Sequence, residues 1–345
     1  MVGDRFIYAE ATFSILNRPV KDCIPYLFDN YNIKLKPISK IQRLVFHSKT
    51  ETSSINGNLG YSNVRGRVDN SYENQLQKQV KAKINFNSKY EYETLCKDFD
   101  CVILATGDGG TSSSLGNFRS DLTCTLKGVT VTGDFIKSIS HVWFNYESIP
   151  KGFAYLIPFS ETQANFVINY PDYPQTIKLD INKIFQEFFD KACKDLDQDL
   201  KITDSFEVTK YMLGICNHPK IENTYFVGNC FGTISPGLGF GQFTSMLTGI
   251  YAAYDICKLG NYEELTKPLF ENYENSLVLR KYLENLDDTS LNKIVKRLDN
   301  KLLEGLIDKT LSSQSKIDLL KDLTPFINLL NNFKDNWKKH VNTSN

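Results

Sequence analysis

The sequence predicts an α/β (α+β) fold that combines a strand–turn–helix unit of the nucleotide-binding type, an antiparallel sheet and a helical carboxyl-terminal part. Three observations predict it. An apolar run at 225–227 precedes a glycine-rich loop and then a stretch at 242–257 that can form a helix. Residues 120–170 alternate polar and apolar side chains between Gly, Ser and Asn, as antiparallel strands do. Residues 262–338 carry Leu and Ile at helical spacing among many charged side chains.

Length and charge limit the classes of function. A chain of 345 residues is long enough for two domains or one large α/β unit. Lys and Arg together number 40, and Asp and Glu also number 40, so the formal net charge is zero. Such a chain has no overall positive field that would attract nucleic acid, and we expect no nucleic-acid partner.

The cysteines and the apolar runs indicate a cytoplasmic protein. Eight cysteines are scattered without paired C-x-x-C motifs, so we expect reduced thiols and no metal site. No amino-terminal signal peptide is recognisable, and no run of about 18 apolar residues could span a bilayer.

From the amino terminus, the first expected element is a strand at 5–10 that ends in Glu10. A carboxylate at the end of the second strand of a dinucleotide-binding fold commonly bonds ribose hydroxyls, although an ordinary strand-end glutamate is the simpler interpretation of this fragment alone. Residues 11–60 look irregular and polar. A helix capped by Ser71 is expected at 71–83.

The remaining elements follow in order. A short strand is expected at 84–86, and a buried strand at 99–107 runs into a glycine turn. After the antiparallel region, residues 181–196 form an amphipathic helix whose phenylalanines we expect to pack into a core. The tail after residue 338 is expected to be disordered.

The loop at 228–241 is the most informative stretch of the chain. It holds five glycines and a proline, and it stands between the expected strand at 225–227 and the helix that begins at 242. Glycines let the backbone come close to a ligand, and a helix amino terminus offers free N–H groups and partial positive charge. This combination predicts an anion or cofactor site.

Four segments, in this order along the chain, resemble the geranylgeranyl reductase family of flavoproteins, which has the p-hydroxybenzoate hydroxylase type of fold. They are the strand and cysteine segment at 6–23, residues 60–76 with the pair Arg65-Gly66, the Ala-Thr-Gly turn at 105–107, and the loop at 228–241.

A fifth segment, Pro-Lys-Gly-Phe-Ala-Tyr-Leu-Ile-Pro at 150–158, is similar to the P-x-x-Y-x-W-x-F-P signature of the family. Here Phe153, Tyr155 and Ile157 replace the Tyr, Trp and Phe of that signature. Alternate residues of a strand face one side, and aromatic faces suit a long apolar chain. The resemblance implies that Phe153, Tyr155, Ile157 and Pro158 bind substrate, while a core strand is an equally good interpretation of this segment alone.

The resemblance implies FAD as the cofactor and a set of residues that bind it. The implied cofactor-binding residues are Glu10, Arg65, Ala105, Thr106, Gly107, Gly228, Asn229, Pro236, Gly237, Leu238, Gly239 and Gly241. Cys23 is implied to lie near the flavin as a candidate catalytic proton relay, and a structural thiol is the alternative. His141 and His218 have no carboxylate or serine partner at a recognisable spacing, so we expect no catalytic role for either.

The expected domains follow the resemblance. They are a discontinuous FAD-binding domain at 1–30, 60–118 and 216–260, an antiparallel-sheet substrate domain at 119–215, a helical region at 261–338 and a disordered tail at 339–345.

Two departures from the family pattern affect the cofactor site. The sequence contains no G-x-G-x-x-G motif, so the Rossmann-like domain is expected to be incomplete, without its first strand, phosphate-binding turn and first helix. Asn229 stands where the family has an aspartate that accepts a hydrogen bond from a ribityl hydroxyl. An asparagine can accept this bond only without the added strength of a charge.

The resemblance implies an FAD-dependent oxidoreductase that reduces C=C bonds of a prenyl lipid or prenyl diphosphate. Its electron donor would be NAD(P)H or a ferredoxin, and it would work in the cytoplasm or at the membrane surface. A flavin monooxygenase or halogenase of the same fold is an alternative. A truncated or degenerate relative that binds an isoprenoid or a partner, without catalysis, is the third hypothesis.

Overall fold

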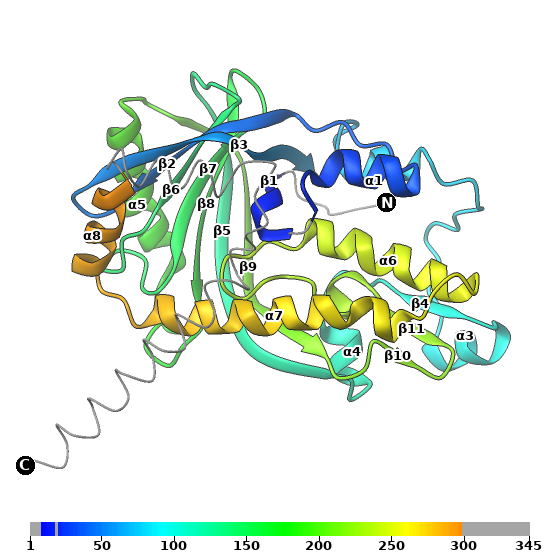
Figure 1. The fold of residues 1–345 in the computed structure, drawn as a ribbon. Helices are drawn as coiled ribbons and strands as arrows, with labels where there is room; N and C mark the ends of the chain where they lie inside the picture. The colour runs from blue at the N-terminus through cyan, green and yellow to red at the C-terminus, as the bar shows by residue number, and fades with distance from the viewer. Residues whose placement is uncertain (1–7, 18–19, 299–345) are drawn as a thin grey trace, which may run out of the picture. The chain divides into compact units, whose positions relative to one another are not determined.

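The computed structural model describes residues 8–17 and 20–298, which divide into two compact units (Figure 1). Unit 1 contains the described residues up to 90 together with 122–211 and 287–298, and unit 2 contains 91–121 and 212–286. The boundaries differ from the expected domains, because residues 8–30 and 60–90 belong to the unit of the larger sheet.

Unit 1 is built on an eight-stranded sheet with the order β1-β3-β2-β6-β7-β8-β5-β9. The strands are β1 (Tyr8–Phe13), β2 (Ser39–His47), β3 (Thr52–Arg65), β5 (Phe118–Thr132), β6 (Ile139–Trp143), β7 (Phe153–Pro158), β8 (Gln163–Pro171) and β9 (Lys201–Cys216). Strands β2 and β6 pair in parallel, and the pairs β1·β3, β2·β3, β6·β7, β7·β8 and β5·β8 are antiparallel. The antiparallel sheet predicted for 120–170 is therefore confirmed.

Helix α5 (Ile181–Leu196) packs against this sheet and completes the core of unit 1 (Figure 1). The Asp180 carboxylate caps it by accepting from the backbone N–H groups of Asn182 and Lys183. Phe185 and Phe188 are buried against Phe166 of β8. Burial of each such ring is worth about 2–3 kcal/mol, and the prediction of a core-packing helix at 181–196 is confirmed.

Two sequence predictions for the first 90 residues are wrong. Residues 11–60 are largely regular, because they contain α1 (Cys23–Tyr31), the short helix η1 (Ser14–Asn17) and most of the β2–β3 hairpin. The sequence did not reveal this hairpin because β3 is rich in Ser, Gly and Asn, which have low strand propensity. Pairing between β2 and β3 stabilises it instead. Residues 84–86 form no strand, and Ile84 and Phe86 are exposed.

Helix α2 (Tyr72–Gln77) is capped as predicted but is shorter than predicted. The Ser71 hydroxyl accepts from the backbone N–H of Asn74. Beyond Gln77 the chain has nothing to bury, since Val80 is half exposed, and the helix ends there.

Unit 2 contains a three-stranded sheet with the order β10-β11-β4. Its strands are β4 (Val102–Leu104), β10 (Lys220–Ile221) and β11 (Thr224–Phe226), and its helices are α3 (Tyr92–Asp98), α4 (Gly110–Ser114), η2 (Gly228–Cys230), α6 (Gln242–Ile256) and α7 (Tyr262–Glu284). Strands β11 and β4 pair in parallel and β10 pairs with β11 in the antiparallel direction. The strand near 102 and the helix near 242 are confirmed, and this small mixed sheet, with its parallel pair β4·β11, is the incomplete Rossmann-like part of the α/β (α+β) fold.

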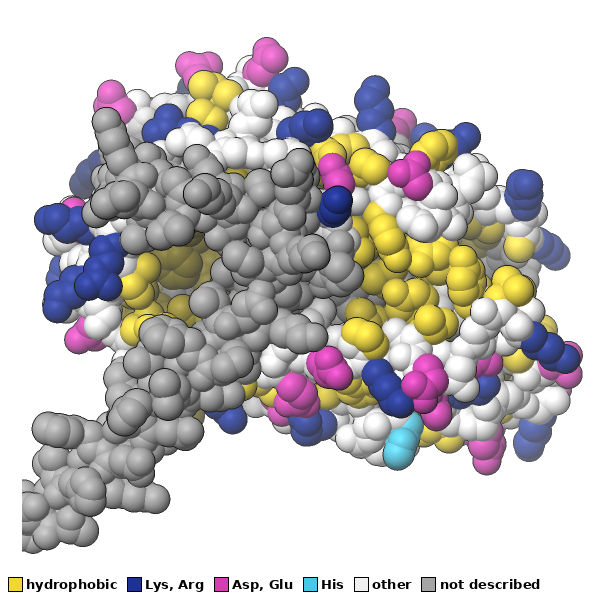
Figure 2. Space-filling view, in the orientation of Figure 1, with side chains coloured by type: hydrophobic (Ala, Val, Ile, Leu, Met, Phe, Trp, Pro, Cys, Tyr) yellow, Lys and Arg dark blue, Asp and Glu magenta, His cyan; other side chains and the backbone are white. Residues whose placement is uncertain are grey.

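The last described element is α8 (Asp288–Leu298), which belongs to unit 1. The predicted helical region is confirmed for α7 and α8, and the rest of it, from 299, lies outside the described residues together with the predicted tail. None of the helices in the described ranges is long and apolar enough to cross a membrane. Figure 2 shows Lys and Arg side chains interspersed with Asp and Glu on the face in view.

Candidate cofactor site

The candidate site in unit 2 lies at the carboxyl ends of the two parallel strands. The turn Ala105-Thr106-Gly107 follows β4, and the turn that begins Gly228-Asn229 follows β11. Because the strands are parallel and adjacent, both turns lie at the same edge of the sheet, where α/β proteins bind their ligands.

Asn229 joins these two turns. Its Nδ2 donates to the carbonyl oxygen of Gly107 at 2.9 Å, and its Oδ1 accepts from the Thr233 hydroxyl at 2.9 Å. An aspartate has no N–H to give the Gly107 carbonyl, so this bond between the two turns needs the asparagine. The departure from the family pattern thus has a structural reason within the chain.

Cys230, in the turn after β11, also contacts the turn after β4. Its buried thiol accepts the backbone N–H of Thr106 at 3.2 Å and lies 3.0 Å from the Thr106 hydroxyl. The Ser112 hydroxyl donates to the Cys230 carbonyl at 2.7 Å. The geometry of the turns is therefore fixed by side chains that the sequence analysis did not single out.

Two backbone N–H groups of the loop before α6 donate hydrogen bonds within unit 2. The N–H of Gly237 donates to the Ser276 hydroxyl at 2.9 Å, and the N–H of Gly239 donates to the Ser235 carbonyl at 2.8 Å. Pro236 and Gly237 are buried, whereas Leu238 is half-buried and Gly239 is exposed. The backbone N–H groups of Gly237 and Gly239 are therefore already used within the protein.

Gly107, Gly228 and Gly239 are positions where glycine opens the site. Their φ angles are +93°, +59° and +79°, in the left-handed region, and a Cβ at any of them would meet no atom within 4 Å. Their backbone thus faces open space that a side chain would fill. Gly241 caps α6 without a side-chain hydrogen bond, so the helix amino terminus keeps its partial positive charge.

Unit 1 holds the other predicted residues, beginning with Glu10. Glu10 lies within β1 and not at the end of a strand, and β1 pairs with β3 in the large sheet, so its expected place in the cofactor sheet is wrong. Its carboxylate pairs with Arg65 at 3.1 Å, and Arg65 also pairs with Glu73. Burial disfavours the charged form of Arg65, but the two carboxylates outweigh it and raise the pKa of the guanidinium.

Cys23 is the first residue of α1 and is almost fully buried. The Ser14 hydroxyl lies 3.8 Å from its sulfur, and the carboxylate of Asp22 caps the helix by accepting from the Ile24 N–H. These contacts suit a structural thiol, and its predicted catalytic role stays a prediction.

Strand β7 carries the predicted substrate residues. Ala154 and Leu156 face the core of unit 1, whereas Phe153 and Tyr155 lie on the opposite face with ring centroids 6.3 Å apart. Ile157 shares that face by alternation, and Pro158 ends the strand. Burial, and then the charge of Glu10, raise the pKa of Tyr155.

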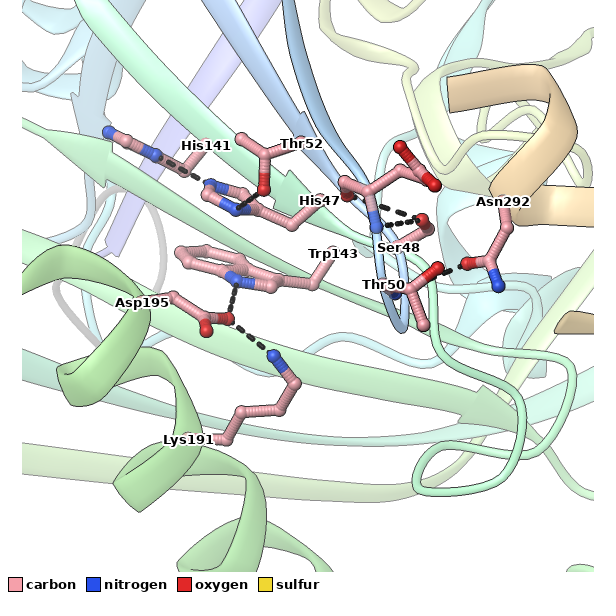
Figure 3. Close-up of polar contacts among 10 residues, drawn as sticks. His47, Ser48, Thr50, Thr52, His141, Trp143, Lys191, Asp195 and Asn292 are labelled. Atoms are coloured by element: carbon pink, nitrogen blue, oxygen red, sulfur yellow. Dashed lines mark hydrogen bonds and ion pairs between the residues drawn. The ribbon is translucent and has the colours of Figure 1, made fainter. Parts of the chain in front are cut away.

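Two of the four histidines, His47 and His141, lie together in a contact that sequence reasoning missed. His47 of β2 and His141 of β6 lie side by side in parallel strands, with Nε2 and Nδ1 3.1 Å apart, and His47 stacks on Trp143 with centroids 4.7 Å apart (Figure 3). The Trp143 indole N–H donates to Asp195 at 2.9 Å. Burial lowers the pKa of each histidine to about 4, so both are neutral at pH 7. His218 is exposed and lies in unit 2.

Sequence reasoning also missed Asn63 of β3, because a lone asparagine in a polar stretch carries no signal. The Asn63 side chain is 1% exposed, and neither its Nδ2 nor its Oδ1 has a hydrogen-bond partner. The buried hydroxyl of Tyr72 and the Oε2 of Glu73 are also without partners. Each such group costs about 1–3 kcal/mol. No group of three or more His, Cys, Asp or Glu side chains suited to a metal occurs in the part of the chain that the structure describes.

Three solved structures resemble this chain over most of its length. A geranylgeranyl bacteriochlorophyll reductase-like protein from Thermoplasma acidophilum matches with a TM-score of 0.61 at 13% identity, over 93% of this chain and 90% of that one. A triple mutant of a flavin-dependent brominase matches with a TM-score of 0.64 at 9% identity, over 97% and 91%. A flavoprotein/dehydrogenase from Cytophaga hutchinsonii matches with a TM-score of 0.55 at 12% identity, over 84% and 83%.

No protein-family model matches the chain. At identities this low, the likeness concerns the fold alone. The chain therefore has the fold that these reductase-like, brominase and dehydrogenase flavoproteins share.

Proposed function

We propose that the protein is a flavin-dependent oxidoreductase that binds FAD beside the turns after β4 and β11. The observation that carries the proposal is the open backbone at Gly107 and Gly239, next to the amino terminus of α6. The residues fit the flavin end of FAD: backbone can approach a flat ring closely there, and the helix terminus favours negative charge on it. The shared fold with flavoproteins supports the same proposal.

The proposed reaction is the reduction of C=C bonds in a prenyl lipid or prenyl diphosphate. Bound reduced flavin would supply a hydride to one carbon of the double bond. Phe153, Tyr155 and Ile157 would hold the apolar chain, since they lie on the face of β7 away from the core. Cys23 is the candidate donor of the proton to the second carbon. NAD(P)H or a ferredoxin would reduce the flavin, in the cytoplasm or at the membrane surface.

Product masses test this reaction. FAD-loaded protein is reduced without oxygen by NADPH or by reduced ferredoxin, and is given geranylgeranyl diphosphate or a geranylgeranyl glycerolipid. The proposal predicts a gain of two hydrogens for each bond reduced. C23S should keep part of the activity that C23A loses, because serine still carries a proton. A reduced flavin that leaves both substrates unchanged would refute the proposed substrate class.

A second candidate is a flavin monooxygenase or halogenase, which the likeness to a brominase favours. The same assay, run with oxygen and bromide or chloride, separates the two, because the product would then gain an oxygen or a halogen. A folded chain that takes up no flavin under any condition would favour the third hypothesis, a non-catalytic binding protein.

A further inference from the structure

A polar patch lies on one face of the β1–β3 pair in unit 1. Glu10 is directly opposite Asn63 in the antiparallel register, and Tyr8 is opposite Arg65. Residues that are opposite in such a pair, and residues two apart in one strand, point to the same side of the sheet. Tyr61, Asn63 and Arg65 of β3 therefore share a face with Tyr8 and Glu10 of β1.

Helix α2 adds two side chains to this patch. Glu73 hydrogen-bonds to Arg65. Tyr72 precedes Glu73 at the start of α2 and is buried. Asn63 is flanked along its strand by Tyr61, which donates to Asp22, and by Arg65, which has a partner from α2.

The patch holds four buried polar atoms that have no hydrogen-bond partner. Neither amide atom of Asn63 has a partner, and the Tyr72 hydroxyl and Glu73 Oε2 also have none. Burial of such groups is costly unless a bound group satisfies them. The side chains of Arg65 and Glu10 remain 26% and 30% exposed, so solvent reaches the patch beside Asn63.

We propose that Asn63, Tyr72 and Glu73 form a binding site for a neutral, hydroxyl-bearing ligand, a polyol. The Glu73 Oε2 and the Asn63 Oδ1 need a donor, and the Asn63 Nδ2 needs an acceptor. A carboxylate gives no donor, and either a carboxylate or a phosphate anion would meet two carboxylates against one guanidinium. An ammonium ion gives no acceptor. Two neighbouring hydroxyls supply both.

This inference concerns binding in unit 1 and does not depend on flavin or on the redox reaction. It is therefore tested on the full chain without FAD, by thermal unfolding with glycerol, glucose or myo-inositol at concentrations up to about 10 mM. Polyols stabilise any protein at molar concentrations by exclusion from its surface, so saturation at millimolar concentration is the required signature. Sodium phosphate and ethylammonium chloride at equal ionic strength are the charged probes.

The proposal predicts that at least one of the polyols raises the Tm by about 1–3 °C with a saturable dependence, and that the charged probes do not. Y72F removes one hydroxyl and should weaken this effect severalfold while the protein stays folded. N63L fills the same space with apolar atoms and should abolish the effect. Y170F changes a tyrosine in the core of the same unit and should leave the effect intact.

Three results would overturn the proposal. They are a Tm that none of the polyols changes in a saturable way, a polyol effect that survives in both N63L and Y72F, and saturable stabilisation by phosphate or ethylammonium instead. Because Y72F alters one atom only, the test remains decisive even if N63L does not fold.

Discussion

The side-chain amide of Asn229 donates to the carbonyl oxygen of Gly107 across 2.9 Å, and so ties the turn after β11 to the turn after β4. The two residues are far apart in sequence and meet only because the two strands are parallel neighbours. The bond sets the spacing of the two turns at the edge of the sheet. It also gives the asparagine at this position a structural role within unit 2.

We predict that N229D lowers the free energy of unfolding by about 1–2 kcal/mol, because a carboxylate replaces the donor and faces the Gly107 carbonyl. Urea denaturation at pH 7 measures the change. The control is N272D, at a partly exposed asparagine of α7, which should change the stability by less than about 0.5 kcal/mol. Equal losses in the two variants would show that the bridge contributes nothing.

How far the sequence predicts the structure depends on whether a signal is local. Helix α5 was predicted with both ends right, because its phenylalanines recur at helical spacing. The Asp180 cap is a feature that the structure adds. The hairpin of β2 and β3 was missed because its stability comes from pairing between polar strands. Glu10 was placed in the wrong sheet, since a short strand carries no information about its partner.

The same holds for the candidate site. Gly107 and Gly239 were singled out by their place in glycine-rich turns that resemble a flavoprotein family, and both adopt φ angles that L-residues rarely adopt. Their cofactor-binding role stays a prediction. The bridge from Asn229 to Gly107, the thiol contact of Cys230 and the orphan amide of Asn63 depend on residues distant in sequence, so no local pattern could reveal them.

Removal of the guanidinium between Glu10 and Glu73 should destabilise unit 1. We predict that R65M lowers the free energy of unfolding by about 2–4 kcal/mol, since two partly buried carboxylates lose their counter-ion. The control R67M removes an exposed arginine two residues away. The triple variant E10Q/R65M/E73Q should recover part of the loss, and no recovery would argue against the charge explanation.

The His47–His141 pair should make the protein less stable in acid. Their pKa values are about 4 in the folded chain and 6.5 when unfolded, so the unfolded state takes up protons first as the pH falls. Stability is full above pH 6.5 and declines between 6.5 and 4, by on the order of 1–2 kcal/mol per histidine at pH 5. Urea denaturation between pH 7.5 and about 5 measures it.

The double variant H47Q/H141Q should reduce this pH dependence, whereas H218Q, which alters an exposed histidine, should retain it. A pH dependence that is unchanged in the double variant would assign the acid sensitivity to other groups.

Thiol accessibility should divide the cysteines into two classes. Cys101 and Cys257 are exposed, and Cys23, Cys216 and Cys230 are buried. We predict that a thiol reagent labels the first two within minutes and the buried three only after unfolding, as read by mass spectrometry of peptides. Rapid labelling of Cys23 in the native protein would show that its side chain is accessible to a reagent and would strengthen its catalytic candidacy.

Flavin binding tests the central claim most directly. Purified protein is titrated with FAD, and bound flavin is followed by its absorbance and by the quenching of its fluorescence. We predict binding of one FAD per chain, which G239V weakens at least tenfold because its side chain fills the open space at the site. G116V, at another open glycine with a φ of +69°, should bind FAD like the unaltered protein. A folded chain that binds no FAD, or equal losses in the two variants, would contradict the account.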